Sequence, residues 1–134
     1  MNVLIVDDQP NIVRVTALAL DLLGCRTFAA GTTAAAEQLL GAEKIDAIFL
    51  DVKLGRECGL EFLSRLVAQD TRPPVVLFTA AARDEVAAEA LRRGAFDCLT
   101  KPFSPDDLRE RVARIEEHLR AREGRLNCEA HRAL

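Results

Sequence analysis

The 134-residue sequence contains no tryptophan, no tyrosine and one methionine, so six phenylalanines supply the whole aromatic content of 4%. With so few rings, the core must consist mainly of leucine, valine, isoleucine and alanine. Long hydrophobic runs are also lacking, and the amino-terminal apolar run Asn2–Val6 is far too short for a membrane span or a signal peptide. We therefore expect one globular domain that does not contact a membrane.

A basic excess is absent as well, because 18 lysines and arginines stand against 21 aspartates and glutamates, a formal net charge of −3. A broad nucleic-acid surface needs such an excess, so we expect no direct nucleic-acid binding by this segment. The four cysteines are far apart and form no C-x-x-C pair, which disfavours a metal site or a disulfide framework. Reduced thiols in a cytoplasmic protein are the simplest interpretation.

Short apolar runs alternate with stretches of helical periodicity along the whole chain. The runs are typical of strands and cover residues 2–6, 25–30, 47–50, 75–78 and 96–100. Proline or a capping side chain marks four of the five expected helix starts, at Pro10, at Thr32 or Thr33, at Asp84, and at Ser104 with Pro105 and Asp107. The remaining helix is expected from about Leu60 to Ala68, and glycine marks expected helix ends at Gly24, Gly41 and Gly94. Strands that are apolar on both faces and alternate with helices predict a doubly wound, parallel α/β sheet.

Polar side chains follow four of the five predicted strands. They are Asp7 and Asp8 after the first, Asp51 after the third, Thr79 after the fourth and Lys101 after the fifth. Ligands of such sheets bind at the carboxyl ends of the strands, so we expect these side chains to meet there. Clustered carboxylates without histidine or cysteine suit Mg²⁺, and an ammonium and a hydroxyl beside them suit a transferring phosphoryl group. Each residue alone could be a turn, a cap or a solvated charge, but their joint placement favours a shared site.

These motifs resemble the receiver domain of bacterial two-component response regulators over about residues 2–117. The matching segments are LIVDD (4–8), FLD (49–51) with Gly59 eight residues later, FTA (78–80) and LTKPF (99–103). The resemblance implies a flavodoxin-like (βα)₅ fold with strand order 2-1-3-4-5. It places the receiver domain at residues 1–120 and a helical extension or linker at residues 121–134.

The resemblance also implies the metal and phosphoryl chemistry of the site. Asp51 is expected to accept a phosphoryl group from a phosphohistidine on a sensor histidine kinase. Mg²⁺ is expected to bind Asp8 directly, Asp7 largely through water, Asp51, and the backbone carbonyl of Lys53. The domain is therefore expected to be a regulator rather than an enzyme, with at most slow self-dephosphorylation.

Three further positions are expected to bind or report the phosphoryl group. Lys101 pairs with it beside a cis bond to Pro102, while Thr79, followed by Ala80, hydrogen-bonds a phosphoryl oxygen and so acts as a switch. Receivers usually carry tyrosine or phenylalanine at the position occupied here by Cys98. We hypothesise that the phosphorylation chemistry is intact and its readout altered, with Phe96 on the same strand face as a candidate substitute; the alternative is that Cys98 merely packs.

The sequence indicates the output and the partners less specifically than it indicates the phosphorylation site. The phrase GAFDCLTKPF resembles receivers of sigma-54-type transcriptional activators, which implies control of transcription, although a stand-alone phosphorelay receiver fits the same residues. The expected partner face comprises the fourth helix, the fifth strand and the last helix, and a homodimer could form there or through the carboxyl-terminal helix. Heptad spacing runs through that helix, at Leu108, Val112, Ile115, Leu119 and Leu126. A frayed tail is the alternative, because Gly124 weakens the helix.

Other function classes fit the sequence less well. A Mg²⁺-dependent phosphatase with an aspartate nucleophile would carry D-x-D after the first strand, which is absent. A flavin or nucleotide binder would need a glycine-rich first turn, whereas this turn reads DDQP. A pseudo-receiver that acts by binding alone would not need the complete set of charged and hydroxyl side chains.

Overall fold

The computed structural model describes residues 1–69, 72–80 and 84–132, without the side chains of Asp84 and residues 125–132. In chain order its elements are β1 (Asn2–Val6), α1 (Pro10–Leu22), β2 (Arg26–Ala30), α2 (Thr33–Ala42), β3 (Ala47–Asp51), β4 (Lys53–Leu54), β5 (Glu57–Cys58), α3 (Gly59–Val67), β6 (Val75–Thr79), α4 (Asp84–Arg92), β7 (Asp97–Thr100) and α5 (Pro105–Arg132). The expected cap at Asp84 and the heptad position Leu126 lie outside the described side chains.

Five parallel strands form the central sheet in the order β2-β1-β3-β6-β7. With β6 and β7 counted as the fourth and fifth strands of this sheet, the order is 2-1-3-4-5, and the predicted flavodoxin-like fold is confirmed. The central strands β3 and β6 are buried at every residue, because helices cover both faces of the sheet.

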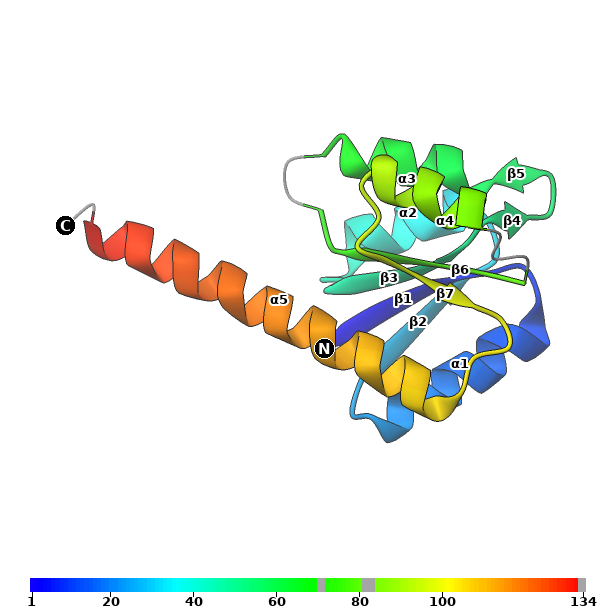
Figure 1. Ribbon diagram of the computed structural model, residues 1–134, viewed down its shortest axis with the longest axis horizontal. Coiled ribbons are helices and arrows are strands. Elements are labelled where there is room, and N and C mark those ends of the chain that lie inside the picture. Colours follow the sequence, from blue (N-terminus) through cyan, green and yellow to red (C-terminus); the bar gives the residue numbers. More distant parts are fainter. Residues whose placement is uncertain (70–71, 81–83, 133–134) are drawn as a thin grey trace.

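Two apolar layers flank the sheet (Figure 1), with α2, α3 and α4 on one face and α1 and α5 on the other. Successive strand residues point to opposite faces. Leu50 and Leu77 therefore pack towards α2, α3 and α4, whereas Phe49 and Phe78 pack towards α1 and α5. The core is largely aliphatic, as the composition predicted.

The helix boundaries follow from local capping chemistry. Thr32 caps α2 by accepting a 3.1 Å hydrogen bond from the Ala35 N–H. At the start of α5, the Asp107 carboxylate accepts from the Ser104 N–H and the Ser104 hydroxyl accepts from the Asp107 N–H, both at 3.1 Å. The prediction that Gly41 ends α2 was wrong, since the helix runs to Ala42.

Phe96 lies before β7 rather than within it, because the regular strand begins at Asp97. Its ring packs on the α1 and α5 side, 5.1 Å from the His118 ring centroid, while Cys98 packs on the α2, α3 and α4 side. The expectation that Phe96 shares a strand face with Cys98 was therefore wrong. Phe96 is not in place to substitute for a ring at position 98.

Two features extend beyond the alternation of strands and helices in the sheet. The expected loop after β3 folds into the antiparallel hairpin β4–β5, which turns at Gly55 with φ of 57°. The last helix, α5, is 28 residues long and its carboxyl-terminal half runs well past the sheet (Figure 1). None of the described helices is long and apolar enough to cross a membrane.

Candidate functional site

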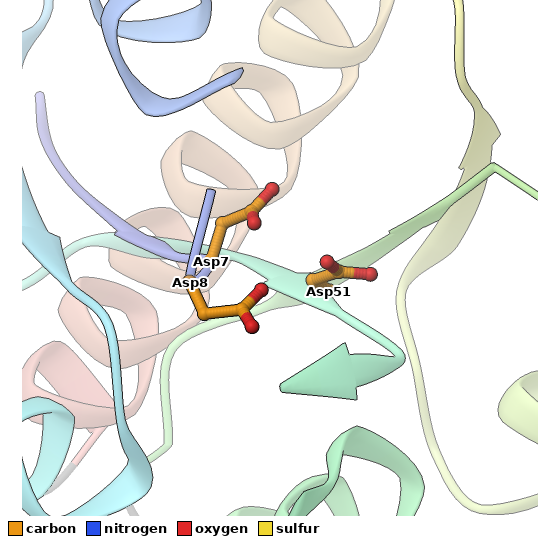
Figure 2. A group of neighbouring side chains, drawn as sticks. All are labelled: Asp7, Asp8 and Asp51. Carbon is orange, nitrogen blue, oxygen red and sulfur yellow. The ribbon is translucent and has the colours of Figure 1, made fainter. Parts of the chain in front are cut away.

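Three carboxylates gather at the carboxyl edge of the sheet (Figure 2). Asp7 and Asp8 follow β1, and Asp51 ends the adjacent strand β3, so that ligand oxygens of the three lie within 4.8 Å of one another. Asp7 and Asp51 are buried and Asp8 is exposed. The parallel register that pairs Val6 with Leu50 brings these side chains together.

Lys101 lies between the two buried carboxylates. Its Nζ is 2.8 Å from Asp7 Oδ2 and 3.4 Å from Asp51 Oδ2, and its side chain is 10% exposed. The ammonium also lies over the Phe78 ring, 4.5 Å from the centroid. The Lys101–Pro102 peptide bond is cis.

Backbone groups orient the carboxylates. The Gln9 N–H donates to Asp7 Oδ1 at 2.9 Å, and the Lys53 N–H donates to Asp51 Oδ1 at 3.2 Å. The Asp7 N–H in turn donates to the carbonyl of Ala30 at 3.0 Å, which ties the β1–α1 turn to the end of β2. One oxygen of each buried carboxylate is thus held by the main chain, and the other faces Lys101.

Burial raises the pKa of the Asp51 carboxyl, although the Lys53 N–H and the Lys101 ammonium oppose that shift and the Asp7 carboxylate adds to it. Three carboxylates lie together, and the Lys101 ammonium contacts two of them, so the cluster carries an excess of negative charge in a confined space. Its donors are carboxylate oxygens, two of them backed by main-chain N–H groups. This donor set fits a hard divalent cation such as Mg²⁺.

The remaining predicted residues lie on or directly after β6 and β7. Thr79 is the buried last residue of β6, its carbonyl accepts from the Lys101 N–H at 2.8 Å, and Ala80 follows it on the surface. Cys98 is half-buried opposite Leu77 on β6. Burial, and secondarily Asp97, raises the pKa of the Cys98 thiol, so this side chain stays protonated and packs as a small apolar group.

Some neighbours of the site were not predicted from the sequence. The Phe78 ring beneath Lys101 could have been found from the alternation of side chains along β6. The hairpin after Asp51 is closed at its base by a 2.6 Å hydrogen bond from the Gly59 N–H to the Val52 carbonyl. Glu57, on that hairpin, bonds to Thr33 on α2, and no local sequence pattern points to this pair.

A family model for the response regulator receiver domain matches residues 3–113 of the chain. The chain belongs to the response regulator receiver family. It is 39% identical over 106 residues to the regulatory protein AtoC of Escherichia coli, covering 79% of this chain and 23% of AtoC. The alginate biosynthesis transcriptional regulatory protein AlgB of Pseudomonas putida is 38% identical over 112 residues, covering 84% of this chain and 25% of AlgB.

Solved structures agree with this assignment. The receiver domain of NtrX from Brucella abortus superposes with a TM-score of 0.80 at 32% identity, covering 86% of this chain and 98% of that domain. The receiver described here spans about a quarter of the length of its curated relatives AtoC and AlgB. Receivers are signalling domains of two-component systems, so the class of protein expected from the motifs is confirmed.

Proposed function

We propose that Asp51 accepts a phosphoryl group from a phosphohistidine of a sensor histidine kinase. Mg²⁺ is held by Asp8 and Asp51 and the Lys53 carbonyl, with Asp7 binding it largely through water. The observation that carries this proposal is the Lys101 ammonium, which is fixed between Asp7 and Asp51 at the carboxyl edge of the sheet. An ammonium and a metal site flanking one carboxylate match the charge requirements of phosphoryl transfer.

The transfer itself exchanges one bond to phosphorus for another. A carboxylate oxygen of Asp51 bonds to phosphorus as the P–N bond to the donor imidazole breaks, and the electron pair leaves with the nitrogen. Lys101 neutralises charge on the phosphoryl oxygens, and bound Mg²⁺ adds further neutralisation. Main-chain bonding of Asp51 Oδ1 to the Lys53 N–H holds the carboxylate in one orientation before the donor arrives.

The readout of phosphorylation is proposed to run through β6 and β7. A phosphoryl group on Asp51 recruits Lys101 and the Thr79 hydroxyl, and Ala80 supplies the adjoining main chain. Because β7 lies between α4 and α5 in the sequence and in the fold (Figure 1), a shift of these strand ends alters the α4–β7–α5 face. We propose this face as the surface for homodimerisation or for the output.

Control of transcription is the output we propose. It rests on the similarity to AlgB, a transcriptional regulatory protein, and on the resemblance to receivers of sigma-54-type activators. We place the receiver at residues 1–120 and a helical extension at residues 121–134. In support of an extension that is held to the domain, the Arg122 guanidinium donates to the Arg72 carbonyl at 3.2 Å. That extension is the alternative dimerisation element.

Phosphorylation is tested by incubating the protein with acetyl phosphate and following its intact mass. Wild-type protein is expected to gain the mass of one phosphoryl group when Mg²⁺ is present and none when the metal is chelated. Asp51→Asn should gain nothing, since an amide oxygen is a poor nucleophile. No gain in folded wild-type protein at saturating Mg²⁺ would favour a pseudo-receiver that acts by binding alone.

Mg²⁺ is expected to stabilise the wild-type fold, with a melting-temperature rise of about 4 °C for each kcal/mol gained. Burial raises the pKa of Asp51 in the folded protein above its value in the unfolded chain. Ionisation of Asp51 therefore lowers the stability of the metal-free protein. This loss grows as the pH rises from the pKa of the unfolded chain to that of the folded protein. Asp51→Asn should therefore melt higher than wild type in chelator at pH 7, and the difference should shrink as the pH falls through the folded pKa. The same variant should lose most of the Mg²⁺ response. Equal Mg²⁺ responses in the two proteins would contradict Asp51 as a ligand.

A further inference from the structure

The Glu57 side chain joins the hairpin after Asp51 to the start of α2. Its carboxylate accepts two hydrogen bonds from Thr33, one from the backbone N–H at 3.3 Å and one from the hydroxyl. Thr33 is the first residue of α2 and is 8% exposed. We call this pair of hydrogen bonds the Glu57–Thr33 clamp.

Helix physics explains why a carboxylate binds at this point. The first N–H groups of a helix have no partner within the helix, and the helix dipole favours negative charge there. Thr32 already satisfies the Ala35 N–H, and Glu57 satisfies that of Thr33 from 24 residues away. The two hydrogen bonds from Thr33 lower the pKa of the Glu57 carboxyl, so Glu57 stays ionised at neutral pH.

The hairpin needs such an anchor. Its strands β4 and β5 have two residues each, and a hairpin this short is not stable by itself in water. Leu54 is buried on one strand, and the Gly59 N–H bonds the Val52 carbonyl at the base. Glu57, which pairs with Leu54 across the hairpin, supplies a third attachment, and it leads to a different element.

The two segments that the clamp joins both reach the acidic cluster within two residues of the clamp. On the hairpin, a Cβ at Gly55 would come within 3.6 Å of Asp8 Oδ2, and Lys53 adjoins Asp51. At the other end, a Cβ at Gly31, just before α2, would lie 3.9 Å from the Asp7 carbonyl oxygen. The clamp therefore closes a ring that runs from the turn carrying Asp7 and Asp8, through the start of α2, to the hairpin.

We propose that Glu57 is a positioning residue for the metal site: by clamping the hairpin to α2 it holds the Lys53 carbonyl and Asp51 at the spacing that Mg²⁺ requires. This inference rests on the proposed function, because it assumes that Mg²⁺ binds at the acidic cluster. Groups that orient metal ligands from behind typically change metal affinity by about 10–100-fold when they are removed. Glu57 acts through the hairpin and touches neither the metal nor the phosphoryl group.

The test is the Mg²⁺ dissociation constant of the intact chain, measured by calorimetry. Glu57→Ala should weaken Mg²⁺ binding about tenfold. Thr33→Val, which keeps the N–H donor and loses the hydroxyl, should weaken it less, and Thr33→Ser should bind as wild type does. Because the two residues act as one unit, Glu57→Ala combined with Thr33→Val should bind Mg²⁺ no more weakly than Glu57→Ala alone.

Glu61→Gln is the matched control for lost charge. Glu61 lies in the first turn of α3 and lines the same surface hollow, of about 400 Å³, as Glu57 and Thr33, but it is not part of the clamp. It should change Mg²⁺ affinity by less than a factor of about two, as expected for an exposed charge. If Glu57→Ala and Glu61→Gln weaken binding equally, charge alone is responsible and the positioning role is refuted.

Phosphorylation kinetics distinguish a loss of metal positioning from a general disruption of the site. The rate with acetyl phosphate should need more Mg²⁺ in Glu57→Ala, yet reach the wild-type value when Mg²⁺ is saturating. A rate that stays low at saturating Mg²⁺, or a wild-type Mg²⁺ affinity in both Glu57→Ala and Thr33→Val, would overturn the inference and leave the proposed function standing. Failure of wild-type protein to bind Mg²⁺ would instead overturn the proposed function.

Discussion

Replacing Lys101 with methionine is expected to lower the free energy of unfolding by about 3 kcal/mol at neutral pH in metal-free buffer. The Lys101 side chain is 10% exposed, and its ammonium contacts both Asp7 and Asp51, which are themselves buried. Methionine retains most of the apolar stem over the Phe78 ring but leaves two carboxylates together without a counter-charge. Removing one member of a buried ion-paired cluster lowers the stability of the fold by more than the cluster contributes to it, because the remaining charges are buried and cannot be hydrated again.

Denaturant unfolding measures this effect, and two conditions should reduce it. Mg²⁺ should restore part of the lost stability by supplying the missing positive charge. Acidic pH should also narrow the gap, since the raised pKa of Asp51 lets that carboxyl protonate early. Lys44→Met, at an exposed lysine remote from the cluster, should change stability by less than about 0.5 kcal/mol. A loss below 1 kcal/mol for Lys101→Met would show that Lys101 does not compensate the acidic cluster.

Gly59→Ala is the second substitution with a large expected effect, a loss of about 3 kcal/mol in the free energy of unfolding. A Cβ at this position would overlap the Asp51 carbonyl oxygen and would lie 2.8 Å from Val52 Cα and 2.9 Å from the Val52 carbonyl oxygen. All three obstacles are backbone atoms at the base of the hairpin, so no side chain can rotate away. Relief requires moving the chain that carries Asp51, and Mg²⁺ affinity should fall together with stability.

Gly41→Ala is the control for the generic effect of adding a methyl group at a helical glycine. Gly41 lies in α2 with open space where the Cβ would be, so alanine should leave stability unchanged or raise it by up to about 1 kcal/mol. Thermal and denaturant unfolding of both variants give the comparison. If Gly59→Ala were as stable as Gly41→Ala, the close approach between the start of α3 and the end of β3 would not exist in solution.

The fold was predictable because its elements follow local rules. Apolar runs alternating with helical stretches predict a parallel sheet covered on both faces, while the strand order came from the family resemblance rather than from periodicity. The two errors lie at the boundaries of elements, where the sequence pattern is least specific. Gly41 does not end α2 because the Glu43 N–H still bonds the Leu39 carbonyl. Phe96 turns towards His118 because it lies just ahead of the regular strand.

The charged groups of the site were predictable for a similar reason, since the ends of parallel strands must meet at one edge. The contacts that hold these charged side chains in place could not be predicted. The Glu57–Thr33 clamp joins residues 24 apart. Thr33 was noted only as a possible helix cap, and Glu57 belongs to no motif that points to Thr33. The hairpin also escaped prediction, because two-residue strands have too few side chains to show a periodic pattern.

The identity of the phosphorylated side chain tests the proposed phosphoryl transfer directly. Borohydride reduces an aspartyl phosphate to homoserine, so treating the phosphorylated receiver and mapping its peptides by mass spectrometry locates the acyl phosphate. We predict homoserine at position 51 alone, in amounts that depend on Mg²⁺. Homoserine at position 7 or 8, or none in protein that has gained a phosphoryl group, would contradict Asp51 as the phosphoryl acceptor.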